Sequence, residues 1–340
     1  MIVKPLTEYC TLNMGQSPDS KTYNTQGNGL PFYQGNADFG ETHPVTRVWC
    51  SAPVKVAADG DILISVRAPI GAMNMAVERC CIGRGLAALT PIRNKCSKQF
   101  LYYALQSKVD SLIAQGTGST FKAISKKVLE ATCIPAYSTI EQEQIAETIG
   151  RVDNTIAARR KQLALLDQLV KSRFIELFGE PELNPRDLPV LPWGAVFQTT
   201  TGKLDSNAMV ENGRYPFFTC AKESYKIDSY AFDCEALLLA GNNAAGIYDV
   251  KHYKGKFNAY QRTYVLRLMN EKWSYILFKR QLEDKLRYLQ SQSKGTNTRY
   301  LTLGILNELR FVVPPIAEQE QFATFVEQTD KSKLCGKMEV

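Results

Sequence analysis

Two sets of polar loops are rich in side-chain types that can form paired hydrogen bonds to planar polar groups such as the edges of DNA bases. Arginine can donate two hydrogen bonds to guanine, asparagine and glutamine pair with adenine, and lysine and arginine attract phosphates. The loops span residues 16–34, 67–74, 79–84 and 117–122, and then residues 203–214, 242–243, 256–262 and 294–299. The candidate DNA-contacting residues within them are Lys21, Asn24, Gln26, Asn28, Arg67, Asn74, Arg84, Lys122, Lys203, Asn207, Arg214, Asn242, Asn243, Lys256, Gln261, Arg262, Lys294 and Arg299. Taken one at a time, such side chains are more often ordinary solvated surface, so the prediction rests on the loops as sets.

Catalytic motifs that would accompany such loops in an enzyme are missing from the sequence. The Pro-Pro pair at 314–315 follows Val313 and lacks the Asn or Asp that an adenine methyltransferase loop needs. Residues 116–119 are rich in glycine but lack the Gly-Lys-Ser/Thr ending of a phosphate loop. The two histidines, His43 and His252, leave little room for general-base chemistry. We therefore expect no catalytic residue, no cofactor and no metal site.

Composition is typical of a cytoplasmic protein with two domains. The chain has 340 residues, of which 44% are hydrophobic and 22% are charged, and this length exceeds one ordinary core. No apolar run approaches the ~20 residues that span a bilayer, and the amino terminus lacks a signal sequence. The nine cysteines include no CxxC pair, so neither a disulfide framework nor a zinc site is predicted. We expect the adjacent Cys80 and Cys81 to be small buried side chains rather than reactive thiols.

The net charge of +7 is concentrated in two separate blocks. Residues 1–140 carry a net charge of +5, and residues 179–317 carry +4. The helical segment between these blocks is neutral, and residues 318–340 are slightly acidic. A basic surface attracts the phosphates of nucleic acids, so DNA is a candidate partner for both blocks.

Five matches in the same order indicate two copies of one unit of about 175 residues. The motif Glu-Gln-Glu-Gln occurs at residues 141–144 and again 177 residues later, at 318–321. The other matches pair residues 115–125 with 294–304, 100–105 with 275–280, 61–65 with 235–239, and 30–35 with 215–220, at offsets of 179, 175, 174 and 185. This alignment places Phe121 opposite Tyr300. In each copy, short strand-like runs precede a helix at 98–115 or 273–292, which predicts a mixed α/β (α+β) fold.

Residues 141–178 are predicted to form one long helix. They contain no proline, and an apolar residue recurs every three or four positions, which is a heptad pattern. The residues of this seam are Ile145, Ile149, Val152, Ile156, Leu163, Leu166, Val170 and Leu177. A helix of this length would extend about 57 Å and needs a partner. The helix expected after residue 318, with Phe322 and Val326 on its seam, is the partner that we predict, packed antiparallel to the first.

Together these features resemble the specificity subunit of a type I restriction-modification system. The resemblance rests on GQSP (15–18), LPFYQG (30–35), GTGSTFKAIS (116–125), isoleucine-proline leading into IEQEQIA (140–146), and FGEPELNPRDLP (178–189). It implies two target recognition domains, residues 1–140 and 179–317, each reading one half of a bipartite site on double-stranded DNA. It implies long spacer helices at 141–178 and 318–340 that form an antiparallel coiled coil and bind methyltransferase (modification) subunits. An ATP-dependent restriction subunit would join the full complex, and this chain would itself be non-catalytic.

The end of the sequence departs from that pattern. After Val326 the seam positions become Thr329 and Lys333, so we expect a shortened second helix and self-association through an uncovered seam on the first. A duplicated scaffold that binds proteins rather than DNA is the main alternative, and a single-chain nuclease or methylase is a more remote one. Salt-dependent DNA binding with a preference for one split sequence would favour recognition.

Overall fold

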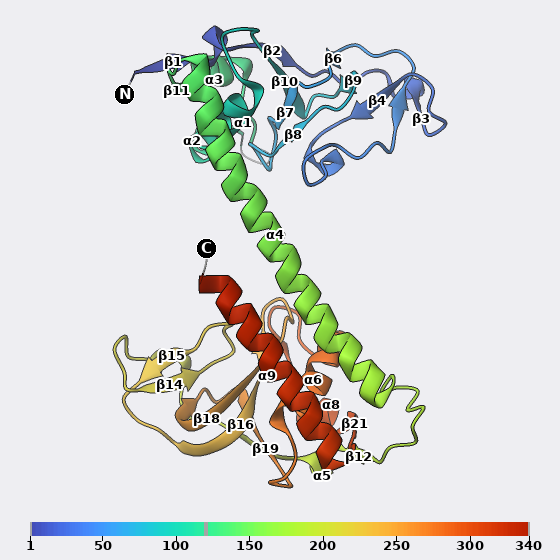
Figure 1. Cartoon of the computed structure of the whole chain (residues 1–340), viewed down its shortest axis with the longest axis vertical. Helices are drawn as coiled ribbons and strands as arrows, with labels where there is room; N and C mark the ends of the chain where they lie inside the picture. The colour runs from blue at the N-terminus through green and yellow to red at the C-terminus, as the bar shows by residue number, and fades with distance from the viewer. Residues whose placement is uncertain (1, 119–121, 339–340) are drawn as a thin grey trace. The chain divides into compact units, whose positions relative to one another are not determined.

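The computed structural model describes residues 2–118 and 122–338, with side chains described as far as Leu334. The chain divides into two compact units, Met1–Ala157 and Ala158–Val340 (Figure 1). None of the helices in the described part of the chain combines the length and the apolar character needed to cross a lipid bilayer. Each unit is a mixed arrangement of sheets and helices, as the sequence predicts.

Unit 1 is built from short strands, with its helices near the end of the unit. Its strands are β1 (Val3–Pro5), β2 (Cys10–Met14), β3 (Tyr23–Asn24), β4 (Leu30–Tyr33), β5 (Trp49–Cys50), β6 (Val56–Ala57), β7 (Ile62–Ser65), β8 (Met73–Met75), β9 (Cys80–Ile82), β10 (Leu86–Pro91) and β11 (Cys133–Pro135). Its helices are α1 (Lys98–Gln106), α2 (Val109–Ala114), α3 (Lys126–Ala131) and the start of α4 (Thr139–Phe178). The sheets have the orders β2-β10-β7-β8 and β3-β5-β4-β9-β6, and β1 pairs with β11.

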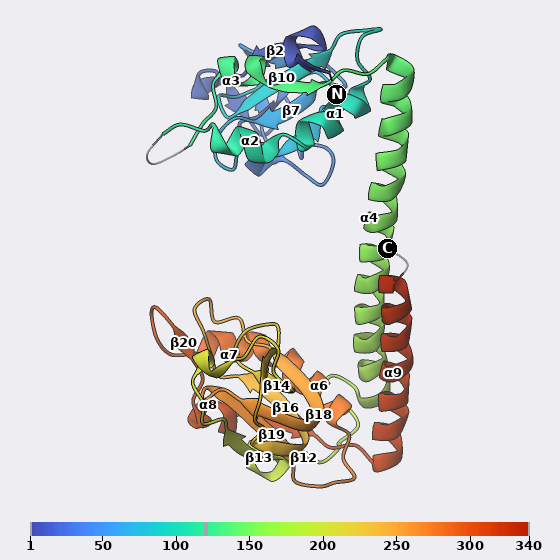
Figure 2. The same ribbon diagram turned by 90° about the vertical axis from the view of Figure 1, so that its left-hand side faces the viewer.

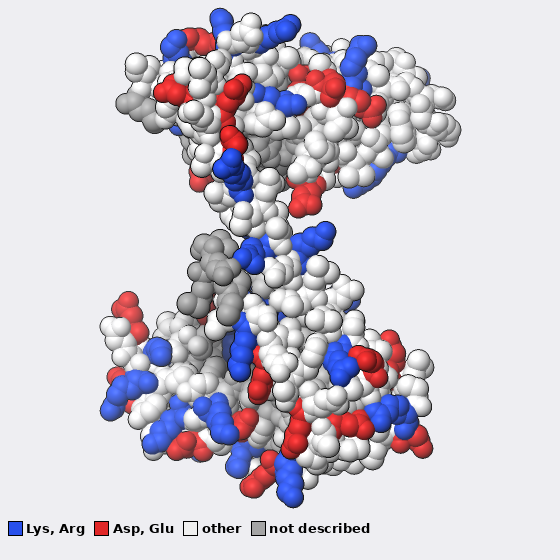
Figure 3. Space-filling model, viewed as in Figure 1, with Lys and Arg blue, Asp and Glu red and all other residues white. Residues whose placement is uncertain are grey.

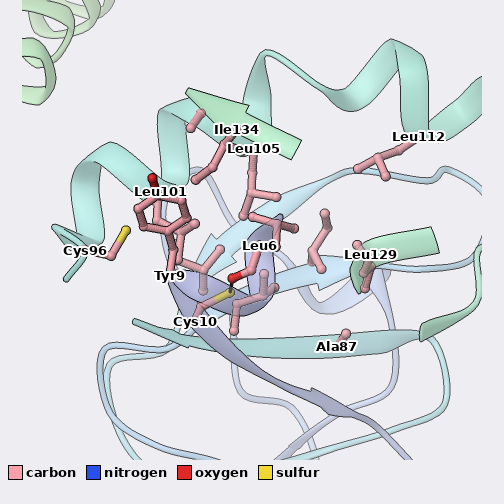
Figure 4. Packing of buried hydrophobic residues seen from close by; sticks show 14 of the residues in the cluster. Leu6, Tyr9, Cys10, Ala87, Cys96, Leu101, Leu105, Leu112, Leu129 and Ile134 are labelled. Atoms are coloured by element: carbon pink, nitrogen blue, oxygen red, sulfur yellow. Dashed lines mark hydrogen bonds between the residues drawn. The ribbon is translucent and has the colours of Figure 1, made fainter. Parts of the chain in front are cut away.

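The core of unit 1 lies on both faces of the sheet β2-β10-β7-β8. Strand residues alternate between the two faces, so Ile62 and Ile64 pack against α1, α2 and α3, while Leu63 and Ala88 pack against the second sheet. Figure 4 shows the helical side of this core, where Leu101 and other helix residues meet the sheet. The Cys80 and Cys81 thiols are fully buried in the second sheet. Burial raises the pKa of Cys80 to about 12, which makes the reactive thiolate scarce and confirms the structural interpretation.

Unit 2 repeats this plan with longer strands. Its strands are β12 (Val190–Pro192), β13 (Phe197–Thr201), β14 (Tyr215–Phe218), β15 (Tyr225–Ile227), β16 (Phe232–Ala240), β17 (Asn242–Asn243), β18 (Val250–Ala259), β19 (Thr263–Leu268), β20 (Arg299–Tyr300) and β21 (Arg310–Val312). Its helices are α5 (Trp193–Val196), α6 (Tyr275–Asp284), α7 (Leu286–Gln292), α8 (Leu303–Asn307), α9 (Ile316–Met338) and the rest of α4. The main sheet has the order β13-β19-β16-β18-β14-β15.

Strand pairing shows that the two units are copies of one fold. In unit 1, β10 lies antiparallel between β2 and β7, and in unit 2, β19 lies antiparallel between β13 and β16. Each unit also has a parallel pair, β4 with β9 and β14 with β18. The pairs β1–β11 and β12–β21 link the first and last strands of each copy. The duplication predicted from the sequence is therefore present in the backbone.

The two copies differ in the continuity of their central strands. β16 and β18 of unit 2 are long and pair along most of their length. In unit 1 the equivalent strands are each split, into β6 and β7 and into β8 and β9. The first split contains Gly60, whose φ is +81°, a conformation that glycine adopts without steric cost. One continuous sheet in unit 2 thus corresponds to two separate sheets in unit 1.

The structure corrects three of the offsets predicted from the sequence, two of which belong to the strands and helices of the two units. Ile64 pairs with β10, Leu239 pairs with the equivalent strand β19, and both side chains belong to the core that packs against the helices. Ile64 is therefore equivalent to Leu239, which gives an offset of 175 rather than 174. A shift of one residue would turn every side chain to the other face. The buried positions of α1 and α6 align at 177 rather than 175, since Leu101 corresponds to Phe278. The helices predicted at 98–115 and 273–292 are each divided into two.

The repeated Glu-Gln-Glu-Gln motif has the same structural task in both units. Gln142 is fully buried, accepts a hydrogen bond from the Ser97 backbone N–H at 2.9 Å, and donates to the carbonyls of Lys95 and Tyr137. Gln319 is fully buried in unit 2 and accepts from the Ser274 N–H at 3.0 Å. Ser97 and Ser274 are the N-cap residues of α1 and α6. The second residue of the motif therefore ties the start of one helix to the start of another.

Within unit 2, the last part of α4 packs against α9 in antiparallel orientation (Figure 2). Near the start of α9, Glu318 pairs at 2.7 Å with Arg186, which follows the end of α4. Fifteen residues further along α9, Lys333 pairs at 2.8 Å with Asp167, inside α4. The described helix α9 has 23 residues, against 40 in α4.

Candidate nucleic-acid interface

Equivalent β-turns connect β9 to β10 and β18 to β19. In unit 1 the Leu86 N–H donates to the Gly83 carbonyl at 3.0 Å, and in unit 2 the Thr263 N–H donates to the Tyr260 carbonyl at 2.8 Å. Each turn is also attached to the end of the neighbouring parallel strand, by Gly83 to Tyr33 and by Tyr260 to Phe218. The second positions of these turns are therefore equivalent, and they hold Arg84 and Gln261.

A second loop lies beside each turn, directly after the central strand. The Val66 N–H donates to the Gly85 carbonyl at 2.9 Å, and the Gly241 N–H donates to the Arg262 carbonyl at 2.9 Å. The next residues, Arg67 and Asn242, are equivalent as well. Two candidates from each copy, far apart in sequence, are thereby brought together by backbone hydrogen bonds.

A third loop completes the arrangement and corrects the last of the predicted alignments. Thr117 pairs with Ala123 in unit 1, and Lys294 pairs with Tyr300 in unit 2, which gives an offset of 177 rather than 179. Ala123 also pairs with Arg67, as Tyr300 pairs with Asn242. Tyr300 therefore corresponds to Ala123, and Phe121, predicted to match it, lies outside the described residues.

The turn and the second loop border a cavity at the same place in each unit, and the third loop lines the cavity of unit 2 only. The cavity in unit 1 has a volume of about 210 Å³, and the one in unit 2 has a volume of about 550 Å³. The first is lined by Gln34, Gly35, Asn36, Ser65, Arg67, Ala68, Arg84 and Gly85. The second is lined by Asn242, Tyr260, Gln261, Arg262, Thr298 and Tyr300. The sequence prediction named Arg67, Arg84, Asn242, Gln261 and Arg262 but missed the tyrosines, which only the aligned turns and hairpins reveal.

The cavity in unit 1 carries positive charge without a local counter-ion. Arg67 and Arg84 are exposed, and neither guanidinium has an acidic partner among the described residues. Two uncompensated arginines beside one cavity favour a ligand with hydrogen-bond acceptors, such as a phosphate or the edge of guanine.

In the corresponding cavity of unit 2, neutral amides occupy both equivalent positions. Asn242 is half-buried, and Gln261 is exposed and donates a long hydrogen bond of 3.4 Å to Asp205. Arg262, the next residue of the turn, supplies a positive charge from the position that Gly85 occupies in unit 1. Both cavities thus present hydrogen-bond donors, but of different chemical types.

Asn74 was predicted to contact DNA, and the structure shows this prediction to be wrong. Its side chain is only 2% exposed and bonds to the backbone of Gly40 and Met73. Asn74 lies within β8, and its amide ties this strand to the backbone of Gly40. Its residue type and loop position could not distinguish it from an exposed asparagine.

Several other candidates already have partners within the protein. Asn24 holds its own turn by accepting from the backbone of Gln26 and Asn28, and Asn243 does the same for Ala245, as asparagine commonly does. The remaining members of this group pair with neighbouring side chains or carbonyls: Arg214 with Asp228, Lys256 with the ring of Tyr230, and Arg299 with the Gln290 carbonyl. The exposed candidates outside the cavities are Lys21, Gln26, Asn28, Lys122, Lys203, Asn207 and Lys294. These positions stay predictions.

The histidines have ordinary structural surroundings. His43 contacts the Met75 carbonyl at 3.0 Å, and His252 stacks on Tyr275 and bonds to Glu235 at 2.9 Å. Burial opposes ionisation of Glu235, but hydrogen bonds from Lys254 and His252 hold its pKa below the usual value. The described residues include no group of three or more His, Cys, Asp and Glu side chains that could hold a metal ion.

The predicted seam of α4 has three kinds of surroundings. Ile145 packs against the core of unit 1, whereas Ile149 and Val152 are exposed. Ile156, Leu163 and Leu166 are half-buried. Val170 and Leu177 belong to a cluster with Phe322 and Val326 of α9. The final part of the seam therefore has a helical partner, while the part around Val152 is open to solvent.

Charged side chains of both signs are interspersed over both units on the face shown in Figure 3. The net charge of +7 is therefore not gathered into one basic patch on that face.

Known proteins share both the sequence pattern and the fold. The family described as type I restriction modification DNA specificity domain matches residues 1–168 and 188–335. The chain is 41% identical over 164 residues to the MjaX specificity subunit of Methanocaldococcus jannaschii, covering 48% of this chain and 39% of that protein. It is 36% identical over 153 residues to the type I restriction enzyme EcoDI specificity subunit of Escherichia coli, covering 44% and 33%.

A solved structure supports the fold over nearly the entire chain. The type I restriction-modification S subunit from M. genitalium matches with a TM-score of 0.68 at 16% identity, covering 99% of this chain and 91% of that one. The regions aligned with the two curated relatives span well under half of those proteins. Two matched segments, a duplicated backbone and a fold shared over the chain lead to one assignment: this protein belongs to the family of type I restriction-modification DNA specificity domains, and it contains two copies.

Proposed function

We propose that this protein is the non-catalytic DNA-recognition subunit of a type I restriction-modification complex. Each globule, residues 1–140 and 179–317, reads one half of a bipartite site on double-stranded DNA. The observation that carries the proposal is the pair of equivalent cavities, each walled by the same turn and the same loop. Family membership explains why the arrangement occurs twice.

The cavities supply chemistry suited to base edges. Arginine, glutamine and asparagine side chains can make two directed hydrogen bonds to a purine in the major groove. Arg84, Gln261 and Asn242 all border a cavity and come from backbone segments fixed by short hydrogen bonds. Rigid backbone supporting flexible polar tips suits a site that must discriminate between bases.

The helices are the part that we assign to partner proteins. Ile149 and Val152 are apolar and exposed on α4, with 36% and 53% of their surface accessible. Leu165 and Leu169 are exposed further along the same helix. Apolar side chains repeated along a helix favour a helix-to-helix contact, so methyltransferase subunits would dock here, and the ATP-dependent restriction subunit would join the complex that they form.

Sequencing of the host methylome tests this function. A bipartite methylated motif should be present and should disappear when the gene is deleted. Replacing residues 1–140 with the corresponding domain of a relative should change only one half of the motif. A motif unchanged by deletion, or a swap that changes neither half, would refute the assignment.

DNA binding in vitro distinguishes recognition from a protein scaffold. Recognition predicts that affinity for all DNA decreases steeply with salt while the preference for one split sequence is retained. A scaffold with merely solvated basic loops would bind DNA without such a preference. Cytoplasmic location follows from this function, because the substrate is cellular DNA.

A further inference from the structure

The two cavities differ by a systematic change of residue type. At the second position of the turn, unit 1 has Arg84 and unit 2 has Gln261. In each unit a backbone hydrogen bond joins the loop after the central strand to the turn. The residue that follows this bond in the loop is Arg67 in unit 1 and Asn242 in unit 2. Both changes replace a guanidinium by an amide.

This change separates contact with a base from contact with a phosphate. A position that binds phosphate in both units would be expected to keep a positive charge in both, because the ligand is the same at every nucleotide. A position that reads a base has no such constraint. Arginine pairs with the O6 and N7 atoms of guanine, and glutamine or asparagine pairs with the N6 and N7 atoms of adenine.

Steric crowding makes Arg84 the side chain that the unit 1 turn can present. A Cβ atom on Gly83 would lie 2.4 Å from Gln34 Oε1, and one on Gly85 would lie 2.5 Å from the Gln34 carbonyl oxygen. Both flanking positions are therefore closed to larger residues by Gln34, the residue that follows β4. Arg84 lies between them, exposed and without an acidic partner among the described residues.

Gln261 has the hydrogen-bonding groups that adenine requires. Its amide nitrogen donates to Asp205 at 3.4 Å, which orients the amide and leaves its second N–H available. The carbonyl oxygen can accept from the adenine N6 amino group while the second N–H donates to N7. Asp205 is a carboxylate, which disfavours the O6 acceptor of guanine, whereas adenine presents an N6–H donor at that place.

We propose that Arg84 reads a guanine in one half of the target and that Gln261, at the equivalent place in unit 2, reads an adenine in the other half. This inference rests on the proposed function and adds the identity of one base in each half-site. Arg67 and Asn242 line the same two cavities, from the loop beside each turn, and can support the same difference.

Exchange of the two residue types tests the proposal. A library of duplex DNA with random sequence would be selected with the full chain, alone and together with the modification subunit of its host. The Arg84→Gln variant should change one position of one half-site from guanine to adenine. The Gln261→Arg variant should make the opposite change in the other half-site. Each lost pairing should weaken binding to the original site roughly 5- to 150-fold.

Arg93→Gln is the matched control, because Arg93 is an exposed arginine that follows the other end of β10 from the turn. It should leave both half-sites unchanged. If Arg84→Gln weakens binding to all sequences equally and alters no preference, Arg84 contacts a phosphate and the proposal is wrong. If the wild-type protein selects no sequence, either alone or together with the modification subunit, the proposed function itself fails, which is a separate result.

Discussion

Gln142 provides the sharpest test of how the repeated motif holds each unit together. Its fully buried amide makes three hydrogen bonds, one to the N-cap of α1 and two to backbone carbonyls. Leucine has a similar size but can make none of them. At about 1 kcal/mol for each hydrogen bond, Gln142→Leu should destabilise unit 1 by about 3 kcal/mol. With a urea slope of about 2 kcal/mol per molar, the midpoint of unfolding should decrease by about 1.5 M.

Gln144 provides a control of the same residue type, two positions along the same helix, with an exposed side chain. Gln144→Leu should change the stability of unit 1 by less than about 0.5 kcal/mol. Urea unfolding gives the free energies, and hydrogen exchange measured by mass spectrometry locates the change in the amides of α1. Equal effects of the two substitutions, or faster exchange in α6 rather than α1, would show that the buried amide does not stabilise unit 1 as we infer.

Three further predictions concern the helices. Phe322 is fully buried against Phe174 and Phe178, so Phe322→Ala should destabilise unit 2 by about 3–5 kcal/mol in urea unfolding. Leu334 is 61% exposed, so the control Leu334→Ala should lower the free energy of unfolding by less than about 1 kcal/mol. The hydrogen bond from Arg186 lowers the pKa of Glu318, so the stabilisation from this pair is present at neutral pH and is lost as the pH falls below about 4.3 and through the lowered pKa. Glu318→Gln should therefore lower the urea midpoint at pH 7, and the difference from the wild-type protein should shrink as the pH is lowered. Exposed Val152 on α4 predicts self-association, and a monomer by light scattering at high concentration, unchanged by Val152→Glu, would contradict it.

The order of elements could be predicted from the sequence because repetition reveals it. The Glu-Gln-Glu-Gln motif marks a helix start in both copies, and the structure begins α4 at Thr139 and α9 at Ile316. The match between residues 30–35 and 215–220 agrees with the pairing of β4 and β14 with their parallel neighbours. These segments have distinctive residues at fixed positions, so chance alignment was improbable.

The alignment of apolar strands could not be settled in the same way. Ile62, Leu63 and Ile64 are all fully buried, so their sequence lacks the alternation that shows which face a residue occupies. Only the pairing with β10 determines that Leu63 faces the second sheet. An offset wrong by one residue is the expected consequence of a strand buried on both sides.

The candidate site was predictable as a set of loops but not as a cavity. Arg67 and Arg84 line one cavity, although strands β8 and β9 separate them in sequence. Asn74 lies between them in the chain and points into the protein instead. Composition can identify polar loops, but only the backbone hydrogen bonds of the turn determine which side chains converge.

The differences between the two copies explain how one fold could recognise different bases. The sheet of unit 1 is split and that of unit 2 is continuous, yet both turns keep the bond from their fourth residue to their first, Leu86 to Gly83 and Thr263 to Tyr260. Backbone groups make these bonds, so the residue at the second position can change without disturbing the turn. The backbone therefore fixes the place of the second turn residue whatever side chain it carries. Substitution at Arg84 or Gln261 should consequently alter which base is preferred while leaving the stability of its unit unchanged, and a variant that changed preference only by unfolding the turn would contradict this account.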